Sequence, residues 1–300
     1  MNDLNRQKEE AYLASYDIST FERPSIAADI AIFSILNADM EHNIRKLTKK
    51  ALKILLIKRA SHPFKDCWAL PGGFCKPGED VIETARRELR EETNVENAYL
   101  QLVGAFGAKD RDPRGWIVSN TFMALMDGEQ CNLRAGTDAW EAKWFQIDVE
   151  GKPQPPEVTK EEVVLVTDYD LELTNEQENM KLTASLREKR VFKHFHETVS
   201  YEILSSENLA FDHAKIILNC LLALRSQAKE NTKMVFDLMP EKFTLTQLQN
   251  SFEIILNQKL VPANFRRKIA DYVVETDEII EGTGYRPAKL FRRNLETFYQ

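Results

Sequence analysis

The feature that most constrains this sequence is a set of acidic residues at fixed spacing between Gly73 and Val95. Glu79 follows Gly73, and the stretch RELREETNV then fills positions 87–95. On a helix, at about 100° per residue, the three glutamates at 88, 91 and 92 project from one side. Like charges at this spacing mildly destabilise a helix, and a hard divalent cation such as Mg²⁺ among their oxygens would explain the cluster.

The loop before this helix has a chemistry of its own. Gly72, Gly73 and Gly78 allow backbone to approach a phosphate closely, and a helix N-terminus adds favourable amide dipoles. Arg87 is a fixed cation that can hold a carboxylate by a forked hydrogen bond. Taken alone, the hexapeptide RELREE is more often a solvated helical face. The joint pattern decides against that interpretation.

That pattern, G-x5-E-x7-R-E-(apolar)-x-E-E-x-G-(apolar), is the Nudix box, and the sequence departs from it at Asn94 alone. Asn readily adopts the left-handed conformation that follows a helix end, so the departure should cost little. Over residues 22–150 the chain therefore resembles Nudix hydrolases, in which water attacks a phosphorus of a diphosphate. The resemblance implies Mg²⁺, with Mn²⁺ as the alternative ion. It implies as metal ligands Glu88, Glu91 and Glu92, with Arg87 and Glu79 in support.

Two further segments bear on this expected site. Glu141 is the candidate general base, although an exposed acid at a strand edge is an equally good interpretation. The segment KDRDPRGW at 109–116 resembles one in the ADP-ribose-handling branch, and favours ADP-ribose or a similar nucleotide as ligand. Without the box it would be an ordinary charged turn. The residues expected to bind substrate are Arg59, Gly72, Gly73, Arg111, Asp112, Arg114 and Trp116.

The expected fold class is α/β. Strands are predicted at 26–36, 51–58, 100–106, 117–125 and 142–147, with a helix at 81–93 among them, which indicates a Nudix α/β/α sandwich with a mixed sheet. A Pro-rich break at 152–156 closes this core, and an alternating, β-like stretch follows. The first domain is predicted to span 1–206, with its core at about 22–150 and an extension at 151–206.

The last third, 207–300, is predicted to form a winged helix-turn-helix domain with a linking or dimerisation helix from Phe211. Thr244 and Gln247 have capping-box spacing, Pro262 suits a helix start, and a hairpin is expected at 279–291. Val273 is assigned to the inner face of the second helix. The layout of the whole segment resembles that of the Nudix-related transcriptional regulators. The residues expected to contact a double-stranded DNA operator are Asn264, Arg266, Arg267, Lys268, Arg286 and Lys289.

Net charge limits the partners. At −7, the chain repels polyanions at long range, so DNA binding requires a local basic face. The four scattered cysteines disfavour a structural zinc site and disulfides. His194 and His196 are interpreted as strand surface. With no apolar span or signal peptide in the sequence, we expect a cytoplasmic protein without a membrane partner. The resemblance to the regulators adds the expectation of a homodimer.

Three functions remain open. The first is a bifunctional protein that hydrolyses ADP-ribose or a related nucleoside diphosphate derivative and regulates transcription in response to it. The second is a plain hydrolase whose winged helix only dimerises. The third is a catalytically silent sensor. Because every acid of the box is present, retained hydrolysis is favoured.

Overall fold

The computed structural model describes residues 3–38, 49–95, 98–131, 139–280 and 287–298. Within them, one large mixed sheet has the strand order β11-β10-β9-β7-β2-β1-β6-β5, and β3, β4 and β8 pair at its sides. Its strands are β1 (Ser25–Asn37), β2 (Lys50–Arg59), β3 (Trp68–Ala69), β4 (Gly72–Phe74), β5 (Tyr99–Phe106), β6 (Ile117–Leu125), β7 (Ala139–Pro153), β8 (Glu157–Val158), β9 (Glu162–Asn175), β10 (Met180–Lys193) and β11 (His196–Glu207).

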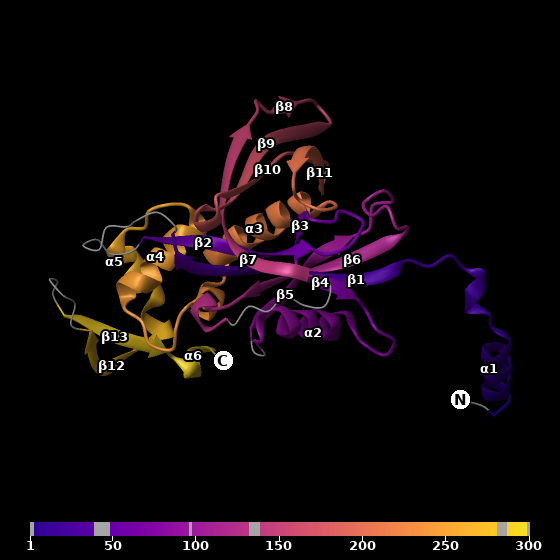
Figure 1. Ribbon diagram of the computed structural model, residues 1–300, viewed down its shortest axis with the longest axis horizontal. Helices are drawn as coiled ribbons and strands as arrows, with labels where there is room; N and C mark the ends of the chain where they lie inside the picture. The colour runs from indigo at the N-terminus through magenta and orange to yellow at the C-terminus, as the bar shows by residue number, and fades with distance from the viewer. Residues whose placement is uncertain (1–2, 39–48, 96–97, 132–138, 281–286, 299–300) are drawn as a thin grey trace.

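Helices cover both faces of the central strands. β1 pairs parallel with β6 and antiparallel with β2, and its run of apolar residues is buried because helices pack above and below it. Helix α2 (Val81–Thr93) packs on one face through Ala85 and Leu89, and α3 (His213–Glu230) covers the other (Figure 1). The predicted α/β/α sandwich is confirmed, and the helix predicted at 81–93 has those bounds.

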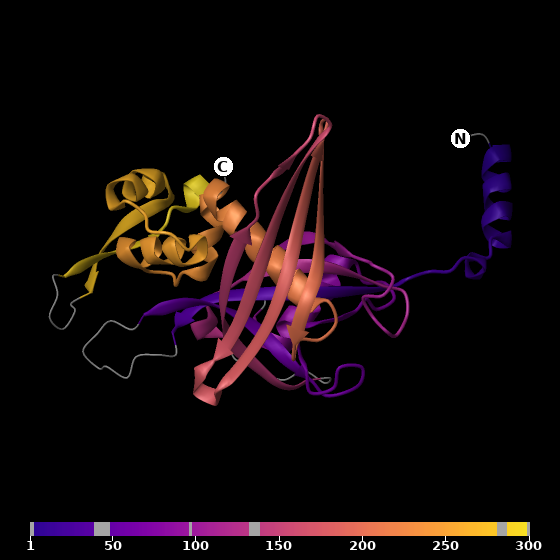
Figure 2. The same ribbon diagram turned by 90° about the horizontal axis from the view of Figure 1, so that it is seen from above.

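The stretch after the core is a long antiparallel extension of the same sheet, as predicted. β9, β10 and β11 form a meander that projects from the body (Figure 2). The Pro-rich segment is less of a break than expected, because β7 runs on to Pro153, which pairs with Thr167. In the described pairing β2 lies beside β7 only as far as Gln146, so Pro153 stands where β7 has β9 on one side alone, and a proline is tolerated at such an edge.

The C-terminal elements form a winged helix beside the sheet (Figure 1). The predicted capping box is confirmed: the Gln247 N–H donates to Thr244 Oγ1 at 3.1 Å, and the Thr244 N–H donates to Gln247 Oε1 at 2.7 Å. The elements are η4 (Thr232–Leu238), α4 (Leu245–Leu256), α5 (Pro262–Ile269), η5 (Ala270–Tyr272), β12 (Val273–Ile280), β13 (Ala288–Arg293) and α6 (Leu295–Phe298).

The wing begins earlier than the sequence indicated. Val273 was expected on the inner face of the second helix, but α5 ends at Ile269, and Val273 opens β12 opposite Arg293. Two successive β-branched residues, Val273 and Val274, favour the extended backbone observed here. The hairpin predicted at 279–291 is therefore the outer part of a longer one.

The two ends of the first domain differ in their packing. Helix α1 (Asp3–Ser15) and the turn η1 (Ile18–Thr20) stand apart from the body (Figure 1). At the other end the last strand of the sheet, β11, finishes at Glu207. We propose that the boundary between the first and second domains lies here, between 206 and 207, and α3 of the second domain packs on the sheet of the first. Among the described helices, none is long and apolar enough to cross a membrane.

Candidate functional site

The box helix α2 is built from local signals. The Asp80 N–H donates to Glu83 Oε2 at 2.8 Å before the first turn. At the other end Asn94 adopts φ 58° and ψ 23°, the left-handed conformation predicted for it, and its N–H donates to the Arg90 carbonyl. With both ends fixed, the face that carries Glu88 and Glu92 is held against the loop before the helix.

Arg87 organises the acids around it. Its Nε donates to Glu79 Oε1 at 2.8 Å, and its Nη1 lies 2.5 Å from Glu88 Oε1 and 3.6 Å from Glu91 Oε1. A hydrogen bond from Arg87, followed by one from the Lys76 backbone, lowers the pKa of Glu79 to about 2. Glu79 thus remains ionised and holds the guanidinium in place, the geometry that a supporting role for Arg87 and Glu79 requires.

Glu88 is packed tightly against the glycine loop. A Cβ on Gly72 would overlap the Ala28 backbone carbonyl, and a Cβ on Gly73 would overlap the Glu88 carboxylate, which would have to move to make room. Burial raises the pKa of Glu88, and Arg87 opposes that shift. A second positive charge at this carboxylate would therefore be stabilising.

The donor chemistry of these acids suits Mg²⁺. Glu88, Glu91 and Glu92 line one pocket and offer carboxylate oxygens, which this ion prefers. In the described part of the chain, no group of three or more acidic, His or Cys side chains is close enough to hold an ion unaided. Mg²⁺ at these acids would therefore need water or substrate phosphates to complete its coordination.

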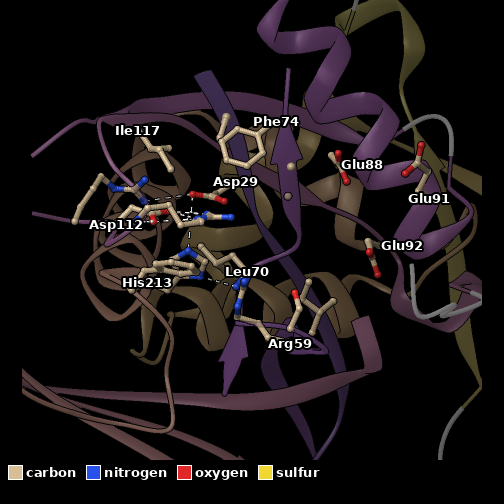
Figure 3. Close-up of a pocket in the computed structure, with 18 of the residues that line it drawn as sticks. Asp29, Arg59, Leu70, Phe74, Glu88, Glu91, Glu92, Asp112, Ile117 and His213 are labelled. Carbon is tan, nitrogen blue, oxygen red and sulfur yellow. Dashed lines mark hydrogen bonds and ion pairs between the residues drawn. The ribbon is translucent and has the colours of Figure 1, made fainter. Parts of the chain in front are cut away.

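The pocket has a volume of about 340 Å³, within the range of small-molecule sites. Glu88, Glu91 and Glu92 lie on one side, and Asp112 and His213 on the other (Figure 3). One wall is thus acidic, while the other combines arginines with acids and aromatic rings. The predicted site residues that line the pocket are Arg59, Gly72, Gly73, Arg87, Glu88, Glu91, Glu92, Arg111, Asp112 and Arg114.

The two arginines of the predicted substrate segment have different environments. Arg111 is buried and binds Asp212 through two hydrogen bonds, of 2.8 and 3.2 Å, with Asp29 at 3.6 Å. Arg114 is 40% exposed and pairs with Asp112 at 2.7 Å. Arg114 therefore has more freedom to reach a ligand, whereas Arg111 is already engaged in holding the segment to the start of α3.

Sequence reasoning missed two pocket residues at the start of α3. The Leu70 N–H donates to His213 Nδ1 at 2.8 Å, which leaves Nε2 to carry the proton of a neutral ring. That Nε2 lies 3.9 Å from Asp29 Oδ2, and burial lowers the pKa of His213. Phe211 also lines the pocket. Nothing in the local sequence indicated that these residues line the pocket, because they reach it through contacts distant in sequence.

Three predicted residues lie elsewhere. Glu79 stands behind Arg87 and supports it. Trp116 is 50% exposed and is not among the described residues that line the pocket, and the same holds for Glu141. The Glu141 carboxylate lies 2.8 Å from Lys143 Nζ. In the pairing of β2 with β7, Glu141 stands opposite Lys58. The geometry gives no support to Glu141 as the base, since its carboxylate is paired outside the pocket.

A second candidate surface lies on α5. Its inner face is apolar, with Phe265 and Ile269 buried. The predicted Lys289 pairs with Glu275 on the wing, and Arg286 lies outside the described residues. The α5 surface thus gives a local basic face on an acidic chain. Its exposed predicted residues are Asn264, Arg266, Arg267 and Lys268.

Comparisons with known families agree with this division. The family model described as "NUDIX domain" matches residues 43–181, and the one described as "NrtR DNA-binding winged helix domain" matches residues 235–293. The chain is a Nudix domain joined to a winged helix.

A relative that matches over nearly its full length shows the family to which this chain belongs. The chain is 30% identical over 298 residues to the "ADPR responsive transcriptional repressor NtrR" of Acinetobacter baylyi, covering 98% of this chain and 92% of that protein. It belongs to this family of Nudix-related transcriptional regulators. The ADP-ribose pyrophosphatase of Methanocaldococcus jannaschii is 45% identical over 102 residues, 34% of this chain and 59% of that protein.

Solved structures share the fold of the whole chain. A MutT/nudix family protein from Enterococcus faecalis has a TM-score of 0.64 at 24% identity, covering 96% of this chain and 93% of that one. Shewanella oneidensis NrtR has a TM-score of 0.57 at 24% identity, covering 91% and 95%. Both domains therefore recur together in proteins of this architecture.

Proposed function

We propose that this chain binds ADP-ribose in the α2 pocket, hydrolyses its diphosphate with the help of Mg²⁺, and binds an operator as a dimer through α5 in a ligand-dependent manner. The observation that carries the proposal is one pocket with the three box glutamates on one wall and arginines on the other, in a chain that also presents an exposed basic helix. The repressor and pyrophosphatase named above, which are relatives of this chain, support the choice of ligand.

The acidic and basic residues of the pocket would have different roles. Glu88, Glu91 and Glu92 would hold Mg²⁺, which would neutralise oxygens of the diphosphate. Arg114 and Arg59 would bind phosphate or ribose oxygens from the opposite wall. Water attacks one phosphorus, the P–O–P bridge breaks, and the products are AMP and ribose 5-phosphate.

The direct test combines calorimetry with product analysis. ADP-ribose should bind the full-length protein, and with Mg²⁺ it should be converted to AMP and ribose 5-phosphate. The DNA upstream of the protein's own gene should bind with an affinity that changes when ADP-ribose is added. Failure of ADP-ribose to bind at any Mg²⁺ concentration would overturn the proposal.

One observation favours a second candidate, a catalytically silent ADP-ribose sensor. Glu141, the expected base, is ion-paired with Lys143 outside the pocket. If no other pocket acid acts as the base, the site could bind the nucleotide and leave it intact. Binding without any product over a full pH series would select this candidate.

Gly73→Ala tests the metal assignment. The added Cβ would displace the Glu88 carboxylate, so we expect Mn²⁺ affinity, measured by calorimetry or electron paramagnetic resonance, to fall about 10- to 100-fold, as for altered second-shell contacts of metal sites. Gly104→Ala is the matched control, because nothing lies within 4 Å of its added Cβ. Equal Mn²⁺ affinity in both variants would remove Glu88 from the metal site.

Arg266→Ala and Arg267→Ala test the DNA surface. Each should weaken DNA binding and reduce the slope of log K against log salt by about one, as expected when one phosphate contact is lost. Lys160→Ala is the control, an exposed cation in the loop between β8 and β9. A salt slope unchanged in both arginine variants would show that α5 packs against protein or solvent rather than DNA.

A further inference from the structure

The segment between β11 and α3 is held firmly against the Nudix domain. Leu209 pairs with Trp68 of β3, and the Ala210 N–H donates to the Trp68 carbonyl at 2.8 Å. Phe211 follows with φ 53°, a left-handed conformation that is uncommon for a bulky residue. Such conformations cluster at functional sites, where surrounding contacts maintain them. Here the contacts direct a large aromatic ring to the pocket.

Two cations of the pocket wall lie over the Phe211 ring. Arg59 Cζ lies 4.8 Å from the ring centroid and Arg114 Cζ lies 5.3 Å from it. The Phe64 ring lies 4.7 Å away on a tilted plane. A planar guanidinium and a planar nucleobase can use the same π-face of an aromatic ring. If an arginine turns to the diphosphate, the face that it leaves becomes a place for the base.

The residues after Phe211 connect this ring to a long helix. Asp212 receives the two hydrogen bonds of Arg111, and His213 accepts the Leu70 N–H. Both therefore fix the first turn of α3 against the pocket. A change at Phe211 would be transmitted to that turn, since each contact is buried and a buried element moves with its neighbours.

The far end of α3 contacts both helices of the winged domain. Arg225 Nε donates to the carbonyl of Ile255 in α4 at 3.2 Å. Lys268 Nζ of α5 donates to the Lys229 carbonyl at 3.1 Å. One helix thus begins at the nucleotide pocket and ends against the basic helix.

We propose that Phe211 is the stacking platform for the base of the bound nucleotide, and that α3 transmits this contact to α5. The inference rests on the proposed function, because it assumes that ADP-ribose occupies the pocket. It adds a base-binding residue at the junction between the domains, and it gives the ligand a physical route to the DNA surface.

The test compares Phe211→Leu with Phe211→Tyr in the full-length protein. Leucine keeps the apolar contact with Phe64 but has no π-face, whereas tyrosine keeps the ring. We expect Phe211→Leu to lose about 5- to 150-fold in ADP-ribose affinity, the range for one stacked base, and Phe211→Tyr to stay within about threefold. Affinity for Mg²⁺-pyrophosphate, which has no base, should be unchanged in both. Phe195→Ala, at a fully exposed ring, is the aromatic control.

The outcomes separate the two proposals. If the wild type does not bind ADP-ribose, the proposed function fails. If the wild type binds and Phe211→Leu binds equally, or if Phe211→Leu weakens pyrophosphate by the same factor, the stacking role is wrong. DNA affinity is then measured with ADP-ribose at saturation for each protein. Phe211→Leu should show a smaller ligand-induced change than the wild type, and an equal change would overturn transmission through Phe211.

Discussion

Glu92→Gln should reduce the Mg²⁺-dependent hydrolysis of ADP-ribose by about 10²- to 10³-fold, the loss typical when one group that stabilises transition-state charge is removed. Glutamine has nearly the same shape but lacks the charge that binds a hard cation. Glu92 is buried on the pocket side of α2, so the substitution changes charge more than packing. The rate of AMP formation at saturating ADP-ribose and Mg²⁺ measures this effect.

Glu83→Gln is the matched control on the same helix. Glu83 lies in the first turn and accepts the Asp80 N–H, a bond that a glutamine carbonyl can also accept. We expect its rate to remain within about twofold of the wild type. If Glu92→Gln retained the wild-type rate while Gly73→Ala lost Mn²⁺ affinity, the ion would be held without Glu92, and the assignment would move to Glu88 and Glu91.

The helix α2 could be predicted from sequence because its signals are local. Asp80 stands at its start, and Asn94 at its end has a side chain that tolerates the left-handed backbone, so both bounds follow from a few neighbouring residues. Glu88, Glu91 and Glu92 face one pocket for the same reason, since helical periodicity fixes their direction. The meander of β9, β10 and β11 was also predictable, from its alternating pattern.

The wall opposite α2 depends on contacts that sequence patterns do not contain. Leu70 and His213 are 143 residues apart, and Arg111 and Asp212 are 101 apart. From the sequence alone, the charged turn around Arg111 is expected to be an exposed ligand-binding loop. The structure instead places the Asp212 carboxylate beside Arg111 and buries both side chains. Glu141 is not among the described residues that line the pocket for a related reason, because strand pairing decides the face on which a side chain lies. Its role as the base stays a prediction.

Arg111→Met should destabilise the folded protein by up to about 3–5 kcal/mol, the cost of breaking a buried ion pair by removing one partner. Lys215, whose Nζ lies 3.2 Å from Asp212 Oδ2, remains and offsets part of this cost. The side chain of Arg111 is 4% exposed and that of Asp212 is 8% exposed, so water cannot replace the lost cation. Arg187→Met is the matched control. The side chains of Arg187 and its partner Asp168 are 40% and 27% exposed, and such pairs contribute less than about 1 kcal/mol. Urea denaturation followed by circular dichroism compares the two variants.

The penalty of Arg111→Met should also depend on pH. Burial alone would raise the pKa of Asp212, but Arg111, together with Lys215 and His213, outweighs burial and holds it below the ordinary value of 3.8. The pair therefore stabilises the fold above about pH 4, and this contribution is lost as pH falls through the depressed pKa of the folded state. Without Arg111, only Lys215 and His213 oppose the effect of burial, so the Asp212 pKa should rise. The variant should then lose stability relative to the wild type as pH rises from 4 to 7. Asp212→Asn in the Arg111→Met background removes the buried charge that has lost its arginine and should recover much of the loss. A penalty for Arg111→Met that was constant across this pH range, or equal to that of Arg187→Met, would show that the Arg111–Asp212 pair does not hold α3 to the pocket.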